Sequence, residues 1–132
     1  MANDFVEQLK NRIKSLTALP VRVGYLSDEP MIAIYSLPGG SITGGFMNGD
    51  VESNLNYEIA IQHRDNEIAI AQMWKINEYL SDFHTVIESG NGSYDFEELK
   101  VDKPYLDERD EQGMFTHKLS LTATIIDKKE NN

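Results

Sequence analysis

The sequence contains no cysteine, which excludes disulfide bonds, thiolate nucleophiles and thiolate metal ligands together. It also lacks a long hydrophobic run, because apolar segments such as 31–35 are far shorter than the ~20 residues that span a bilayer. The first residues, with Asn3, Asp4 and Glu7, lack the basic start and the apolar stretch of a signal peptide. These absences predict a cytosolic protein that is neither exported nor embedded in a membrane.

Positive charge is also scarce. The chain has 12 lysines and arginines against 22 aspartates and glutamates, which gives a formal net charge of −10 at pH 7. Binding of a nucleic acid backbone requires cations that displace its counterions, so this composition argues against sequence-specific binding of nucleic acid. It allows a surface past which DNA moves without being held, because like charges do not attract.

Length and composition limit the organisation of the chain. Of its 132 residues, 40% are hydrophobic and 26% are charged, values near those of globular proteins, which argues against wholesale disorder. We expect one domain over residues 1–126, and we expect the polar tail over residues 127–132 to be disordered.

Two apolar stripes recur at helical spacing. The first comprises Phe5, Leu9, Ile13 and Leu16, and the second comprises Ala69, Met73, Ile76, Leu80 and Phe83. Intervals of three and four residues place such side chains on one face of a helix. Asn3 or Asp4 can cap the first helix, and Asp65 or Asn66 can cap the second. The sequence therefore predicts two helices, each with one buried face.

The remaining apolar pattern is typical of strands. Residues 21–26 and 31–37 are joined by a turn-like segment and predict a hairpin, and Asn91-Gly92 predicts a second hairpin between residues 84–88 and 93–101. A shift of apolar parity within 93–101 indicates a β-bulge. Strict alternation over 55–63 and 114–126 predicts two longer strands with one buried face each. Together these elements predict an α+β fold: a mainly antiparallel, mixed β-sheet with two principal helices packed on one face.

Residues 38–50 contain five glycines and little periodicity, which predicts a long, pliable loop. The segment has neither the Gly-Lys-Ser/Thr nor the G-x-G-x-x-G pattern, so a phosphate site is disfavoured. Two interpretations stay open: an ordinary surface loop, or a loop whose apolar side chains are buried against a partner. If the loop is buried against a partner, the candidate assembly contacts are Pro38, Gly39, Gly40, Ile42, Phe46, Met47 and Asp50.

The sequence shows no pattern of catalytic, cofactor-binding or metal-ligating residues. His63, His84 and His117 lie on separate segments without the paired spacing of a zinc site. No G-x-S-x-G motif is present. Trp74 adjoins the apolar stripe of the second helix, which favours a packing role. We therefore expect no enzyme activity, no cofactor and no metal.

An acidic cluster precedes the last strand and comprises Asp107, Glu108, Asp110 and Glu111. A calcium loop would need an oxygen ligand at its third position and glycine at its sixth, where this chain has Arg109 and Gln112. The cluster is typical of a solvated turn. The alternative is an exposed patch that meets a basic partner or lines a negatively charged channel.

The order of these features resembles a known family. The run Leu37–Gly40, then Asn48-Gly49-Asp50, the alternating strand over 56–63, the acid-capped helix through Leu80, and the turn Asp110–Gly113 before a long strand resemble phage tail-terminator and minor capsid proteins. Such proteins are known chiefly from siphophages and prophages of Gram-positive bacteria. The resemblance spans roughly residues 4–126.

The resemblance implies a structural protein without catalytic residues. It implies a homo-oligomer, a hexameric ring at the end of the tail tube that stops tube growth and meets the head. The implied partners are further copies of the chain, the tail-tube protein and a head-tail connector protein, with DNA passing through the ring. The implied location is the bacterial host cytoplasm during assembly and then the virion tail. The alternatives are another head-tail connector or tail-completion protein, or a small cytosolic ligand-binding or regulatory domain.

Overall fold

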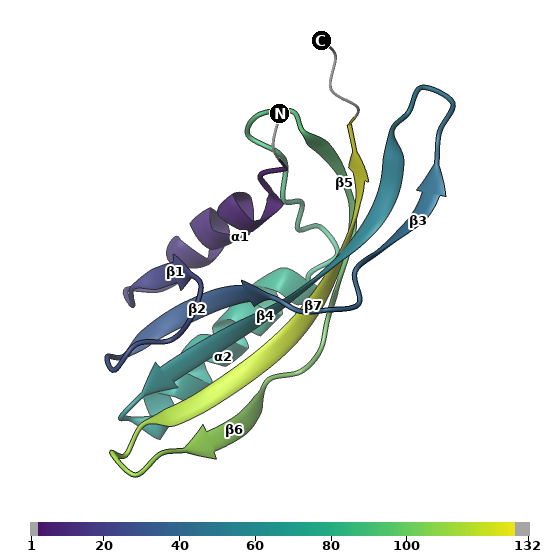
Figure 1. The fold of residues 1–132 in the computed structure, drawn as a ribbon. Helices are drawn as coiled ribbons and strands as arrows, with labels where there is room; N and C mark the ends of the chain where they lie inside the picture. Colours follow the sequence, from purple (N-terminus) through teal and green to yellow (C-terminus); the bar gives the residue numbers. More distant parts are fainter. Residues whose placement is uncertain (1–2, 129–132) are drawn as a thin grey trace.

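The computed structural model describes residues 3–128. Along the chain it contains α1 (Phe5–Lys14), β1 (Val21–Val23), β2 (Met31–Ser36), β3 (Ser41–Gly45), β4 (Val51–His63), α2 (Asn66–Ser81), β5 (Tyr94–Val101), β6 (Tyr105–Arg109) and β7 (Phe115–Asp127). The seven strands form one sheet, and the two helices pack against it (Figure 1). The predicted α+β class is confirmed.

The sheet is built around two long strands, β4 and β7, which pair antiparallel along their full length from Val51–Asp127 to His63–Phe115. On the edge of β4 away from β7, β3 pairs with residues 51–54 and β2 with residues 57–62. On the edge of β7 away from β4, β6 pairs with residues 115–118 and β5 with residues 121–127. Five of the six strand pairings are antiparallel, and β1–β2 is parallel. The sheet is therefore mixed, as predicted.

The core lies between the sheet and the helices. It is formed by the apolar stripes of both helices and by alternate side chains of the central strands, among them Phe5, Leu9, Ile13, Ile32, Ile34, Ile59, Ile61, Met73, Ile76, Leu80, Leu119, Leu121 and Ile125. Alternation with period two points these strand residues to the helix side. The predicted stripes of both helices are confirmed within α1 and α2. Leu16 lies beyond the end of α1 but still packs against the core, whereas Phe83 lies beyond the end of α2 and is exposed.

The opposite face of the sheet is polar and half-buried. Thr122 and Thr124 of β7 donate hydrogen bonds across the strand pair to Asn56 and Asn54, each at 2.8 Å. Lys118 lies 3.1 Å from Asp107 and 3.6 Å from Glu58. Burial alone would lower the pKa of Lys118, but its hydrogen bond to Asp107 and the nearby negative charges raise it. This face is held by cross-strand polar pairs.

The first predicted hairpin is wrong. β1 runs parallel to β2, with Val21 opposite Ile32. The connection after β1 must therefore run back along the sheet, so that β2 starts beside the start of β1. Gly24 has a φ of 131°, which favours glycine at the start of this connection. The side-chain amide of Gln62 donates to the carbonyls of Ser27 and Glu29 and holds the connection against β4.

The second predicted hairpin is also wrong in part. Residues 84–89 form no strand, although Gly92 has the positive φ of 74° expected in the turn. Ile87 is instead buried in the core, where its carbonyl accepts a 2.7 Å hydrogen bond from the Tyr94 hydroxyl. The bulge predicted in the following strand is confirmed, since the β5–β7 register shifts between Phe96 and Glu98.

α2 begins at the predicted cap. The Asp65 carboxylate accepts hydrogen bonds from the backbone N–H groups of Glu67 at 3.0 Å and Ile68 at 3.4 Å. Loss of such a cap costs about 1 kcal/mol. We expect Asp65→Ala to lower the free energy of unfolding by about that amount in urea titrations followed by circular dichroism. Glu78→Ala, on the exposed side of the same helix, serves as the control and should change it by less than about 0.5 kcal/mol.

Candidate assembly surfaces

The glycine-rich segment 38–50 forms the first strand and the turn of a β-hairpin, so the predicted pliable loop is wrong. Its residues 41–45 form β3, which pairs antiparallel with the first residues of β4. At the tip, the Phe46 N–H donates to the Asp50 carbonyl at 2.9 Å, and Gly49 takes a φ of 93°. The hairpin projects past the helices at one end of the sheet (Figure 1). The side chains of its tip therefore lie outside the core between the sheet and the helices.

The hairpin exposes three large apolar side chains. Met47 is fully exposed, Ile42 is 70% exposed and Phe46 is 49% exposed. Exposed apolar side chains on a projecting element are candidates for burial against another protein. Phe46 and Met47 also line a shallow pocket with Asn48, Asp50, Ile126 and Lys128.

The other predicted contacts of this segment differ in exposure. Pro38, Gly39 and Gly40 are exposed at the base of the hairpin. A side chain at Gly40 would meet the Asn54 carbonyl at 2.9 Å, so this close approach requires glycine. Asp50 is only 8% exposed, and its carboxylate accepts a hydrogen bond from the Asn48 side-chain amide at 3.1 Å, so it supports the tip.

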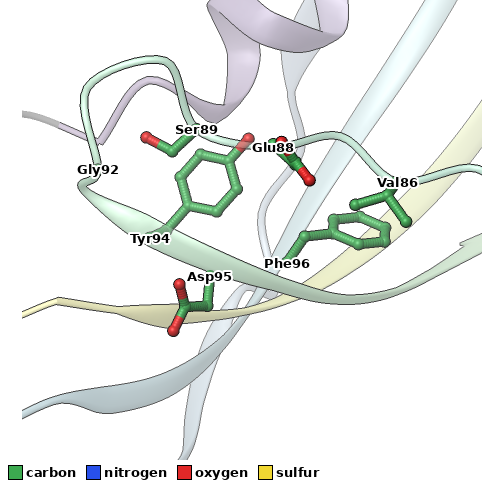
Figure 2. Close-up of a pocket in the computed structure, with 7 residues that line it drawn as sticks. All are labelled: Val86, Glu88, Ser89, Gly92, Tyr94, Asp95 and Phe96. Carbon is green, nitrogen blue, oxygen red and sulfur yellow. The ribbon is translucent and has the colours of Figure 1, made fainter.

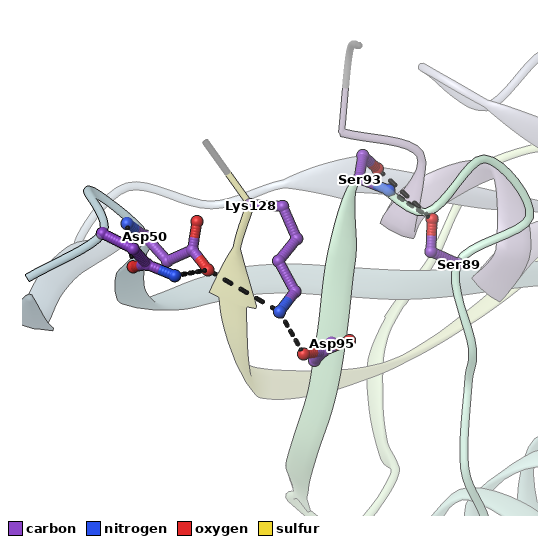
Figure 3. A network of polar contacts seen from close by, with 6 residues as sticks. Asp50, Ser89, Ser93, Asp95 and Lys128 are labelled. Carbon is purple, nitrogen blue, oxygen red and sulfur yellow. Dashed lines mark hydrogen bonds and ion pairs between the residues drawn. The ribbon is translucent and has the colours of Figure 1, made fainter. Parts of the chain in front are cut away.

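Lys128 lies between the hairpin tip and β5 and forms an ion pair with each (Figure 3). Its ammonium group lies 2.6 Å from the Asp95 carboxylate on β5 and 3.6 Å from that of Asp50. The hydrogen bond with Asp95 raises the pKa of Lys128. Sequence reasoning missed this residue because it lies in the predicted tail 127–132. Asp127 ends β7, Lys128 is held by these contacts, and residues 129–132 lie outside the described residues.

We expect Lys128→Ala to loosen the hairpin tip without unfolding the protein. The substitution leaves Asp50 and Asp95 without their shared cation, so amide hydrogens near the tip, including that of Phe46, should exchange faster. Hydrogen-exchange mass spectrometry measures this effect. Lys100→Ala, which removes an exposed cation 4.0 Å from Glu98, is the control and should leave exchange at the tip unchanged.

The acidic cluster divides between a strand and a turn. Asp107 and Glu108 lie in β6, an edge strand on β7, so a turn over the whole cluster is the wrong prediction. Asp110 forms the turn, where its carboxylate accepts from the N–H groups of Gln112 at 2.9 Å and Met114 at 2.8 Å. All four carboxylates of the cluster, including Glu111, are on exposed residues.

A polar network ties the first helix to the turn before β5. The Asp4 carboxylate accepts hydrogen bonds from the hydroxyls of Ser89 at 2.6 Å and Ser93 at 3.0 Å, and from the Gly90 N–H at 2.8 Å. The Asp4 side chain does not cap α1. The Asn3 side-chain oxygen accepts a hydrogen bond from the N–H of Phe5, the first residue of α1, at 2.9 Å. Burial alone would raise the pKa of Asp4, but these hydrogen bonds lower it to about 2.

The pocket beside this network has little chemical capability. It is lined by Val86, Glu88, Ser89, Gly92, Tyr94, Asp95 and Phe96 (Figure 2). The Ser89 hydroxyl is engaged with Asp4, and no histidine or lysine lines the pocket to activate it. The arrangement lacks the nucleophile and base pair that acyl transfer needs.

The three histidines are not brought together. His117 is buried beneath the start of α2, where its ring contacts the Asn66 side-chain oxygen at 2.7 Å, and burial lowers its pKa. His63 accepts from the Asp65 N–H at 2.9 Å, and His84 is exposed beside Asp82. Within residues 3–128, no three His, Cys, Asp or Glu side chains are placed to hold a metal ion. Trp74 is half-exposed on α2.

The family comparison agrees with these features. A family model described as "Bacteriophage tail terminator protein" matches residues 5–126. The chain belongs to the bacteriophage tail terminator family. It is therefore a structural protein of phage tails. No helix in the described part of the chain is long and apolar enough to cross a lipid bilayer.

Solved structures share the fold of this family member. A chain from the virion of a native gene transfer agent particle is 11% identical, with a TM-score of 0.59, over 92% of this chain and 91% of that chain. A second solved chain is 14% identical, with a TM-score of 0.53, over 100% of this chain and 99% of that chain. The comparison with curated proteins gives no match. At these identities the likeness concerns the fold.

Proposed function

We propose that the chain forms a ring, a hexamer in the assembled tail, at the head-proximal end of the phage tail tube. The ring stops tube growth and joins the tube to the head. Its role is non-enzymatic, and its partners are further copies of itself, the tail-tube protein and a head-tail connector protein. Assembly takes place in the host cytoplasm and leaves the chain in the virion tail. The tail-terminator family match over residues 5–126 is the observation that carries this proposal.

The projecting hairpin β3–β4 supports a contact with the tube. The hairpin projects past the helices, and its exposed Ile42 and Met47 are available for burial against a neighbouring ring of tube protein. Burying a side chain of this kind contributes roughly 1.5–3 kcal/mol. Six copies of such a contact in one ring would bind a tube end through avidity.

The charge of the chain supports passage of DNA through the ring. A net charge of −10 repels the phosphate backbone, so DNA entering the tail meets no attractive site at which it would stall. The same charge keeps the free protein soluble before assembly.

A tube-growth assay tests the proposal. Purified tail-tube protein polymerises in the presence of increasing amounts of the chain, and tube lengths are measured by negative-stain electron microscopy. We expect tubes to become shorter as the ratio of chain to tube protein rises, with the chain at one tube end. Unchanged length distributions at every ratio would contradict the proposal, and binding to the connector alone would favour a connector role.

A further inference from the structure

Two strands lie at opposite ends of one continuous row across the sheet. The pairings join Val21 of β1 to Ile32, Ile61, His117 and finally Leu106 of β6. Strands in a sheet are about 4.8 Å apart, so β1 and β6 are separated by about 19 Å along this row. Figure 1 shows α1 and β1 on one side of the molecule and β6 on the other. The two edges therefore face away from each other.

The two edges carry opposite charge. Residues 10–22, which cover the second half of α1 and reach into β1, include Lys10, Arg12, Lys14 and Arg22 and no acidic residue. Residues 102–111, which include β6, hold five acidic and two basic residues. A basic segment is unexpected in a chain of net charge −10, and it lies opposite an acidic one.

Both edges also expose apolar side chains. Val23 and Tyr25 are exposed at the end of β1, and Tyr105 and Leu106 are exposed on β6. The Arg22 guanidinium donates two hydrogen bonds to the Tyr25 carbonyl, at 2.9 and 2.6 Å, which fixes the cation beside these apolar groups. Each edge thus combines apolar area with charge, as interfaces between proteins do.

We propose that the basic edge (Lys14, Arg22, Val23 and Tyr25) of one copy binds the acidic edge (Tyr105, Leu106, Glu108 and Glu111) of the next copy. This inference rests on the proposed function and names the contact that closes the ring. Two different surfaces on opposite sides of one subunit make a head-to-tail contact, and repetition of such a contact closes a ring when the rotation fits. The hairpin β3–β4 is left free for the tube.

Charge reversal tests the contact. Lys14→Glu with Arg22→Glu makes both edges acidic, and Glu108→Lys with Glu111→Lys makes both edges basic. Each double variant alone should associate at least about tenfold more weakly, because like charges then face each other across the interface. Lys75→Glu and Glu78→Lys, exposed on α2 away from both edges, serve as controls and should assemble as the unmodified chain does. Circular dichroism checks that every variant is folded.

Mixing the two double variants gives the decisive result. In an alternating ring every acidic edge meets a basic edge, so an equal mixture should restore rings, with three copies of each variant in a hexamer. Sedimentation velocity and electron microscopy of tube ends detect the rings, and native mass spectrometry gives their composition. Rings formed equally well by each variant alone, or folded variants that fail to form rings when mixed, would overturn this contact. Failure of the unmodified chain to cap tubes would instead refute the proposed function.

Discussion

Replacing Ile42 and Met47 with serine is expected to weaken binding to tail-tube ends by about 100-fold or more. Both side chains are exposed on the hairpin β3–β4 and are 70% and 107% accessible, so the isolated protein loses little packing. On the tube, each would lose roughly 1.5–3 kcal/mol of apolar burial. Two such losses exceed the 2.8 kcal/mol or so that corresponds to a 100-fold change in affinity.

Binding is measured by cosedimentation of the variant with preformed tubes, and stability by urea titration. Phe83→Ser is the matched control, because Phe83 is 89% exposed but lies after α2, outside the hairpin. We expect the control to bind as the unmodified chain does. Full binding by the Ile42 and Met47 double variant would rule out the hairpin as the tube contact.

The second large effect concerns the attachment of α1. Asp4→Asn is expected to lower the free energy of unfolding at pH 7 by about 2 kcal/mol. Hydrogen bonds to a charged group contribute about 1.5–3 kcal/mol, and partial exposure of the site reduces the sum over several of them. Because the folded-state pKa of Asp4 is lowered from 3.8 to about 2, its ionised form contributes stability above pH 4. That contribution is lost as the pH falls from about 4 to about 2.

The difference between Asp4→Asn and the unmodified chain should therefore shrink as the pH approaches 2. Urea titrations at pH 7, 4 and 2 measure it. Glu7→Gln, on an exposed position of the same helix, is the control and should differ little from the unmodified chain at any of these pH values. A difference between Asp4→Asn and the unmodified chain that stays constant from pH 7 to pH 2 would show that the carboxylate charge does not hold α1 to the turn at 89–93.

The elements predicted correctly are those whose pattern comes from burial on one face. The alternation through Ile59 and Ile61 and the stripe through Met73 and Ile76 reflect side chains pressed between sheet and helices. The α2 cap was also readable, because Asp65 acts on backbone groups two and three residues away. Local signals suffice where the interactions are local or the buried face is continuous.

The failures arise where distant residues decide the structure. A short connection and two apolar runs favour a hairpin, but Gln62 holds the chain so that β1 runs parallel to β2. β3 has no buried face, so its residues show no alternation, and only pairing with β4 makes them a strand. The network of Asp4 with Ser89 and Ser93 joins positions about 85 residues apart, which no local pattern reveals.

The assembly surfaces were only partly predictable. Ile42, Phe46 and Met47 stand out in the sequence as apolar residues among glycines, and the structure exposes them. The basic edge did not stand out, because Lys14 and Arg22 are unremarkable until the strand order sets them opposite β6. Lys128 fell within the predicted tail, yet it pairs with Asp50 at the hairpin tip and with Asp95 on β5. The sheet topology determines which of these charges lie at an edge of the sheet.

We propose that the chain acts through shape-matched protein surfaces at one end of the tail tube. The most direct measurement is electron microscopy of preformed tubes incubated with the gold-labelled chain. We expect one ring of the chain, about six copies, on a single end of each tube and none along the shaft. Label spread along the tubes, or no bound label at saturating concentration, would contradict it.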